Sequence, residues 1–189
     1  MFPILGIMAS QISGHLVTSS YESIQTVTVG SGGSSSISFT SIPSTYQHLQ
    51  IRGIGKTTNA GTIGNPGITF NADTNVNNYT LHILYGDGSS AAALGGGAGT
   101  GTDTSITTGS TAAANIFGVA VIDILDYAST NKYKTVRSLT GADLNGSGTI
   151  RLYSNLWMNT SAITSITLKP SASASYSEYS QLALYGIKG

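Results

Sequence analysis

Short runs in which apolar and polar residues alternate recur along the chain from Ser20 onward. Val, Ile, Thr, Tyr and Phe are frequent in these runs, and Gly, Pro or Asn marks most of the boundaries, as expected of β-strands joined by turns. In Gln47–Ile54, Leu49 and Ile51 alternate with Gln50 and Arg52. The same pattern predicts strands at Ser23–Val29, Ser36–Thr40, Gly67–Phe70, Tyr79–Tyr85, Thr149–Tyr153, Ile163–Leu168 and Ser180–Lys188.

The longest apolar run, Ile116–Thr140, predicts a hairpin with a short loop at Ala128–Asn131. One register pairs opposite charges and apolar side chains at once, as cross-strand neighbours prefer. It places Asp126 opposite Lys134, Asp123 opposite Arg137, Ile124 opposite Val136, Val121 opposite Leu139, and Tyr127 opposite Tyr133. If the Asp123 pair is the buried one, we expect Arg137→Ala to destabilise the fold more than Lys134→Ala, because stranding a buried charge costs about 3–5 kcal/mol.

Both faces of the first strand of this hairpin are apolar. Ala120, Ile122 and Ile124 lie on one face, and Val119, Val121 and Leu125 lie on the other. A strand of this kind is normally covered on both faces. We expect a second sheet to cover one face, and a loop or a neighbouring subunit to cover the other.

About ten short strands without a convincing helical period predict an all-β fold. We expect a single-domain β-sandwich over residues 20–189, with jelly-roll connectivity. Asn145-Gly146 is a tight-turn signal. Ser89–Ala114 consists mostly of Ala, Gly, Ser and Thr, and we expect a long loop that lines an exposed rim or becomes ordered against a neighbour.

Residues 1–19 are predicted to form an extended N-terminal docking arm, because Pro3, Gly6 and Gly14 interrupt its apolar run. Such an arm exposes apolar surface unless a partner covers it. An arm folded back on its own domain is the alternative. The candidate docking residues are its hydrophobic anchors, Phe2, Ile4, Leu5, Ile7 and Met8.

The composition narrows the classes of partner. Hydrophobic residues make up 40% of the 189 residues, charged residues only 8%, and the net charge is zero. Without a basic excess, binding to nucleic acid or to an anionic membrane surface is not expected. The chain has no cysteine, which excludes disulfides and thiolate sites, and no apolar run long enough to predict a membrane-spanning helix.

The candidate chemical motifs are weak. The stretch from Arg52 to Thr57 imitates the end of a phosphate-binding loop but lacks its first glycine and the helix that should follow. Asp73–Asn77 has the early oxygen spacing of a calcium loop, but Leu84 stands where the loop requires glutamate. The histidines, His15, His48 and His82, are far apart, and no nucleophile signature is present. We therefore expect no enzyme activity, no metal and no cofactor. The ten tyrosines are candidates for ligand recognition, because tyrosine can stack and donate a hydrogen bond. The alternative is that they pack in the core and at the rim of the sandwich.

Long stretches of the sequence resemble tailed-bacteriophage virion structural proteins. They cover most of the sequence after Ser20: Ser23–Arg52, Leu84–Ser90, Val121–Gly141, Leu156–Leu168 and Leu182–Gly189. Members of this family resemble capsid decorations, head fibres or tail-fibre tips, and no catalytic residues come with the resemblance.

The resemblance implies a place on the exterior of the virion. The first expectation is a capsid decoration (cement) protein, a homotrimer whose arm docks on the major capsid protein, on another virion protein or on a neighbouring subunit. The alternatives are a tail-fibre or receptor-binding domain, with Ser89–Ala114 at its tip, and a carbohydrate-active enzyme on the virion.

Overall fold

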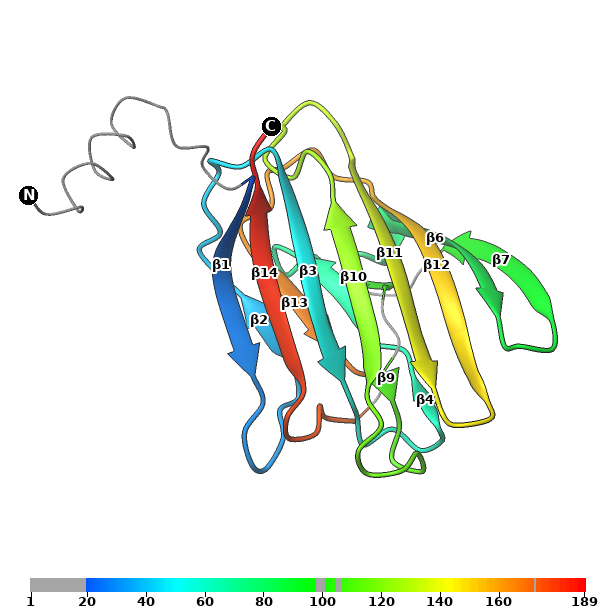
Figure 1. The fold of residues 1–189 in the computed structure, drawn as a ribbon. Coiled ribbons are helices and arrows are strands. Elements are labelled where there is room, and N and C mark those ends of the chain that lie inside the picture. Colours follow the sequence, from blue (N-terminus) through cyan, green and yellow to red (C-terminus); the bar gives the residue numbers. More distant parts are fainter. Residues whose placement is uncertain (1–19, 98–100, 105–106, 172) are drawn as a thin grey trace, which may run out of the picture.

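The computed structural model describes residues 20–97, 101–104, 107–171 and 173–189, and it shows two antiparallel sheets packed face to face (Figure 1). The predicted all-β sandwich is confirmed, and the jelly-roll connectivity stays a prediction. The arm of residues 1–19 and its anchors Phe2, Ile4, Leu5, Ile7 and Met8 lie outside the described residues.

The larger sheet has eight strands in the order β1-β14-β3-β10-β11-β12-β6-β7, and every neighbouring pair is antiparallel. The bounds of these strands are β1 Tyr21–Thr28, β3 His48–Gly55, β6 Tyr79–Gly86, β7 Ala91–Gly97, β10 Gly118–Ile124, β11 Lys134–Asp143, β12 Gly148–Trp157 and β14 Gln181–Ile187.

The smaller sheet has four strands in the order β2-β13-β5-β8 and packs behind the larger one in Figure 1. Its strands are β2 Ile37–Phe39, β5 Gly67–Phe70, β8 Thr102–Asp103 and β13 Ile166–Lys169. A two-stranded ribbon of β4 Ile63–Gly64 and β9 Thr107–Thr108, and one 3-10 turn, η1 Val76–Asn78, complete the elements of the described residues.

The core lies between the two sheets. Large apolar side chains from both inner faces form one cluster, in which Phe70 and Trp157 meet with ring centroids 5.4 Å apart. The alternation predicted in β3 and β14 is confirmed, because Leu49, Ile51 and Leu184 are fully buried in it. Trp157 ends β12, so the strand predicted at Thr149–Tyr153 is longer than expected.

The central hairpin has the predicted register over its strands. Asp123 stands opposite Arg137, Ile124 opposite Val136, and Val121 opposite Leu139. The predicted turn also forms between β11 and β12, where Asn145 and Gly146 both have positive φ, 61° and 107°, as a two-residue hairpin turn requires.

Part of the Ser89–Ala114 loop prediction is wrong. β7 runs through its start and pairs with β6, and β8 and β9 follow. Ala and Gly have low strand propensity, so local sequence favoured a loop. The backbone hydrogen bonds offered by β6 outweigh that preference at the edge of the sheet.

Candidate docking surface

The outer face of the eight-stranded sheet carries a patch of exposed large apolar side chains. We define this apolar face by five exposed side chains, Leu84 of β6, Val119 of β10, Leu139 of β11, and Ile150 and Leu152 of β12, together with the half-buried Val121 of β10. Leu84, Leu139 and Ile150 expose 56%, 54% and 59% of their surface. On a solvated antiparallel sheet these positions are normally polar.

The strand register makes the patch continuous. Leu84, Leu152, Leu139 and Val121 stand directly opposite one another in one row across β6, β12, β11 and β10. Side chains opposite one another on antiparallel strands lie about 5 Å apart. The apolar face is therefore one contiguous surface, and patches of this kind mark interaction sites.

The next row is interrupted by glycines. Ile150 stands between Gly86 and Gly141, and Gly141 stands opposite Val119. The absence of side chains at these glycines leaves an open hollow of about 630 Å³, floored by the apolar face and rimmed by the β6–β7 and β11–β12 turns. Two smaller hollows, of about 500 and 300 Å³, adjoin Leu84 and Leu152.

The other half of the same outer face is polar. Arg52 lies over the rings of Tyr21 and Tyr185, 5.3 and 6.0 Å from their centroids. Its Nε donates to Gln50, whose Nε2 donates to Asp123 at 2.5 Å. These groups satisfy one another, so this half is an ordinary solvated surface.

The outer face of the smaller sheet is also polar. Ser38, Thr167 and Thr69 form a row of hydroxyl side chains across β2, β13 and β5, and Ser38 Oγ lies 3.0 Å from Thr167 Oγ1. The apolar face, with the neighbouring exposed Ile54 of β3 opposite Val119, is therefore a local property of this part of the larger sheet and does not reflect the composition of the chain as a whole.

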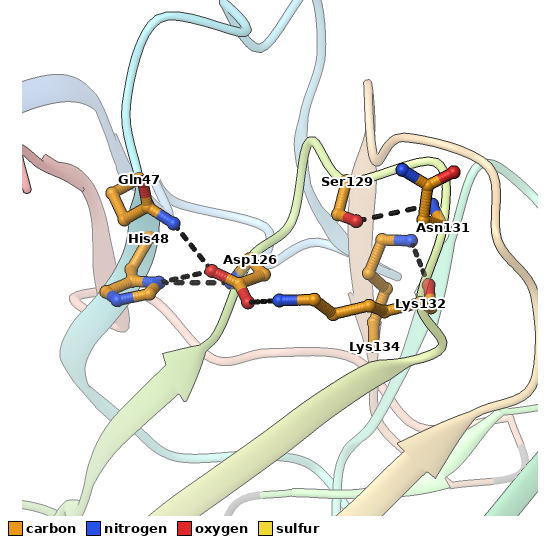
Figure 2. A network of polar contacts seen from close by, with 7 residues as sticks. All are labelled: Gln47, His48, Asp126, Ser129, Asn131, Lys132 and Lys134. Atoms are coloured by element: carbon orange, nitrogen blue, oxygen red, sulfur yellow. Dashed lines mark hydrogen bonds and ion pairs between the residues drawn. The ribbon is translucent and has the colours of Figure 1, made fainter.

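The predicted pairing of Asp126 with Lys134 is wrong, whereas Asp123 stands opposite Arg137 as predicted. β10 ends at Ile124, so Asp126 lies in the connecting loop with φ of 48° and pairs with Lys132 at 2.6 Å. Gln47 Nε2 donates to the same carboxylate at 2.6 Å, and His48 Nδ1 accepts from the Asp126 backbone at 3.0 Å (Figure 2). The hydrogen bonds from Lys132 and then Gln47 lower the pKa of Asp126.

Lys134 is the buried charge of the hairpin. Its side chain is fully buried, and Nζ donates to the backbone oxygen of Lys132 at 2.9 Å (Figure 2). Nζ also donates to the backbone oxygen of Thr160 at 3.1 Å. Burial lowers its pKa. Asp123 accepts from Gln50 and Arg137 is exposed, so the Asp123 pair is not the buried one, which was the condition for a larger effect of Arg137→Ala.

The predicted contact between Tyr127 and Tyr133 is also wrong. Tyr127 is fully buried and donates its hydroxyl to the Pro43 carbonyl, whereas Tyr133 is exposed. The chain leaves the strand register after Ile124, and tertiary packing then decides the direction of each side chain.

Lys56 and Asp73, from the phosphate-loop-like and calcium-loop-like stretches, make hydrogen bonds within the fold. Lys56 Nζ donates to the carbonyl oxygens of Gly109, Ala112 and Ala113 at 3.0–3.1 Å, which fastens that loop to the end of β3. Asp73 accepts from Trp157 Nε1 at 2.8 Å and from the Asn75 backbone at 2.9 Å, so this segment is an Asx-type turn that supports the core.

Histidine and tyrosine have ordinary surroundings. His48 belongs to the Asp126 network, His82 is exposed beside the apolar face, and His15 lies outside the described residues. Within residues 20–189 as described, no three His, Asp or Glu side chains gather as metal ligands do. Four tyrosines are fully buried, Tyr79, Tyr127, Tyr153 and Tyr176, so they serve the core.

Sequence reasoning found one strand of the apolar face and missed the rest. Val119 and Val121 are visible as a second apolar side of the hairpin, whereas Leu84, Ile150 and Leu152 sit in strands with unremarkable alternation. Only the strand order brings them together. The cover predicted for this side is not found among the described residues, where Val119 is exposed and Val121 is half-buried.

No family model and no curated protein matches this chain. Among the described residues, no helix is long and apolar enough to cross a membrane.

Proposed function

We propose that this protein is a structural component of bacteriophage virions, and specifically a capsid decoration protein that binds the exterior of the assembled capsid and stabilises it. The apolar face is the observation that carries the proposal. A single domain with this much contiguous apolar surface is suited to an assembly in which that surface is covered.

Two further observations support the proposal. Long stretches of the sequence between Ser23 and Gly189 resemble virion structural proteins. The chain also has a net charge of zero and few charged residues, so copies repel one another weakly when they are crowded on a particle. The partners are other copies, in a homotrimer, and the major capsid protein or another virion protein. The role requires no catalytic residue and no cofactor.

The number of copies in purified virions tests the proposal. We expect quantitative mass spectrometry to find this protein in a fixed proportion to the major capsid protein, as a lattice component requires. Particles that lack it should release their DNA at a lower temperature than complete particles. A few copies per particle, with unchanged particle stability, would contradict the proposal and favour the tail-fibre alternative.

A further inference from the structure

We propose that the apolar face binds residues 2–8 of a neighbouring copy, so that copies are joined by exchange of their N-terminal segments. The inference rests on the proposed function, because it names the partner that covers the apolar face in the assembled state. Three features of the molecule argue for this occupant: the shape of the face, its lack of charge, and the place where the segment leaves the domain.

The shape of the apolar face suits individual bulky side chains. Gly86 and Gly141 leave gaps on both sides of Ile150, and the face is divided into adjoining hollows of about 630, 500 and 300 Å³. A flat sheet face would bridge such hollows and leave them empty, at the expense of packing contacts. An extended segment can place one side chain in each, and residues 2–8 supply Phe2, Ile4, Leu5, Ile7 and Met8.

The segment and the face also match in charge. Residues 1–16 contain no Asp, Glu, Lys or Arg, although the chain has sixteen such residues elsewhere. The six residues that define the apolar face are likewise uncharged, and the charged side chains on the same side of β11, Arg137 and Asp143, lie at its two margins. Burying a charge against an apolar surface is costly, so two uncharged apolar partners are the favourable combination.

The position of Ser20 favours exchange over self-covering. Ser20 accepts from the backbone of Lys188 beside β1, at the edge of the sheet, and Ile150 lies five strands away on β12. Strand spacing and rise place Ile150 about 33 Å from Ser20, and residues 9–19 span at most about 40 Å when fully extended.

A self-covering segment would therefore run almost taut across the polar half that is filled by Tyr21, Arg52 and Tyr185. It would also leave the isolated domain with no apolar surface to drive assembly. A segment from a neighbouring copy does not have to cross the polar half, and it leaves the apolar face free to drive assembly. A head-to-tail contact of this kind closes into a ring such as a trimer.

Matched variants of the full-length chain test the exchange. The face variant is L139E/L152E, at two exposed positions, and the segment variant is I4D/I7D. The controls add the same charges nearby: S23E/T26E, at exposed positions on the outer face of the same sheet, and S10D/Q11D, just after the segment. Masses are measured by light scattering in the absence of capsids.

We expect the wild-type chain and both controls to form one closed oligomer, and each test variant alone to run at the monomer mass of 19.4 kDa. A mixture of the two test variants should regain association and double that mass, because one copy supplies an intact face and the other an intact segment. No other arrangement of the two surfaces predicts this complementation.

Engineered cysteines then locate the contact, since the chain has none of its own. Copies carrying Ile4→Cys should cross-link to copies carrying Leu139→Cys, and not to copies carrying Thr26→Cys. Cross-linking within one chain that carries both Ile4→Cys and Leu139→Cys would show self-covering and overturn the proposal. A wild-type monomer, or a segment variant that remains oligomeric while the face variant dissociates, would also overturn it.

Failure of this inference is distinct from failure of the proposed function. If the variants show no exchange but the protein is still present in lattice copy number on virions, another virion protein covers the apolar face. If exchange occurs but the protein is absent from the capsid lattice, the oligomer contact stands and the decoration role fails.

Discussion

At the scale of single residues, burial decides which polar groups matter for stability. Lys134 and Arg137 lie three residues apart on β11, yet one is fully buried against Trp157 and the other is exposed. The ammonium of Lys134 is held by carbonyl oxygens, so it fastens the connecting loop and the segment after β12 to the strand.

We expect Lys134→Ala to lower the free energy of unfolding by about 2–4 kcal/mol, because it removes charged hydrogen bonds and leaves a cavity. Arg137→Ala, the matched control on the same strand, should change it by less than about 0.5 kcal/mol. Urea denaturation measures both. Similar losses in the two variants would show that Lys134 is not the buried charge that the structure describes.

Two buried tyrosines differ in their hydrogen bonds. Tyr79 donates to the Asp73 carbonyl at 2.9 Å and accepts from the Phe70 backbone at 3.2 Å. The Tyr176 hydroxyl has no hydrogen-bond partner among the described residues. We expect Tyr79→Phe to cost about 1–3 kcal/mol and Tyr176→Phe to be neutral or stabilising. A loss of the same size at Tyr176 would reveal a partner for its hydroxyl.

The same tyrosines predict loss of stability at alkaline pH. Burial raises the pKa of Tyr79 to about 12 and raises the pKa of Tyr176, whereas an unfolded tyrosine titrates near about 10. The folded state therefore keeps protons that the unfolded state loses, so their stabilising contribution is complete below pH of about 10 and falls as pH rises above it. Denaturation midpoints between neutral pH and pH of about 11 should fall less steeply in Tyr176→Phe.

At the scale of elements, close backbone approach fixes one glycine of the central sheet. A Cβ at Gly53 of β3 would lie 2.0 Å from the Gln181 carbonyl oxygen and 2.8 Å from the Leu182 Cα on the neighbouring β14. These are backbone atoms of a paired strand, so they cannot move away without breaking the pairing.

Gly53→Ala should therefore destabilise the fold by about 1–3 kcal/mol or more through overpacking. Gly96→Ala is the matched control in the same sheet, since a Cβ there would meet nothing within 4 Å. Thermal unfolding of the two variants gives the comparison. If Gly53→Ala melts with the wild type, β3 and β14 are less closely paired than the structure describes.

At the scale of the whole molecule, the two outer faces differ in polarity, and under the proposed function this contrast sets which face meets a partner. The hydroxyl row of Ser38, Thr167 and Thr69 suits solvent, whereas the apolar face suits a partner. Attachment through this surface depends on burial of apolar area and little on charge.

Salt dependence distinguishes attachment through apolar burial from attachment through charged groups. We expect the affinity of the protein for capsids to change by less than about twofold as ionic strength rises from 0.05 to 0.5 M, because there is little charge to screen. Equilibrium binding to capsids that lack the protein measures this. A tenfold loss of affinity across that range would mean that charged groups outside the apolar face carry the attachment.

The local sequence was sufficient to predict the all-β class and most strands from alternation, the turn at Asn145-Gly146 from its residue types, and the register of the central hairpin from its charged and apolar pairs. These properties are local: side chains on a strand alternate between faces, and neighbouring strands of a hairpin meet within a few residues. The errors begin where the chain leaves β10, at Asp126 and Tyr127, because tertiary contacts decide the partners of a loop. Lys134, at the start of β11, therefore lacks its predicted partner.

Only the tertiary structure decided where the apolar face lies. Leu84 and Val121 are 37 positions apart in the sequence, and they join one row because β12 and β11 lie between β6 and β10. That strand order depends on long-range backbone pairing and on the burial of the opposite face, which no local pattern contains. The sequence predicted a second apolar side on one strand, and the packing of the sheet extended it into a surface across four.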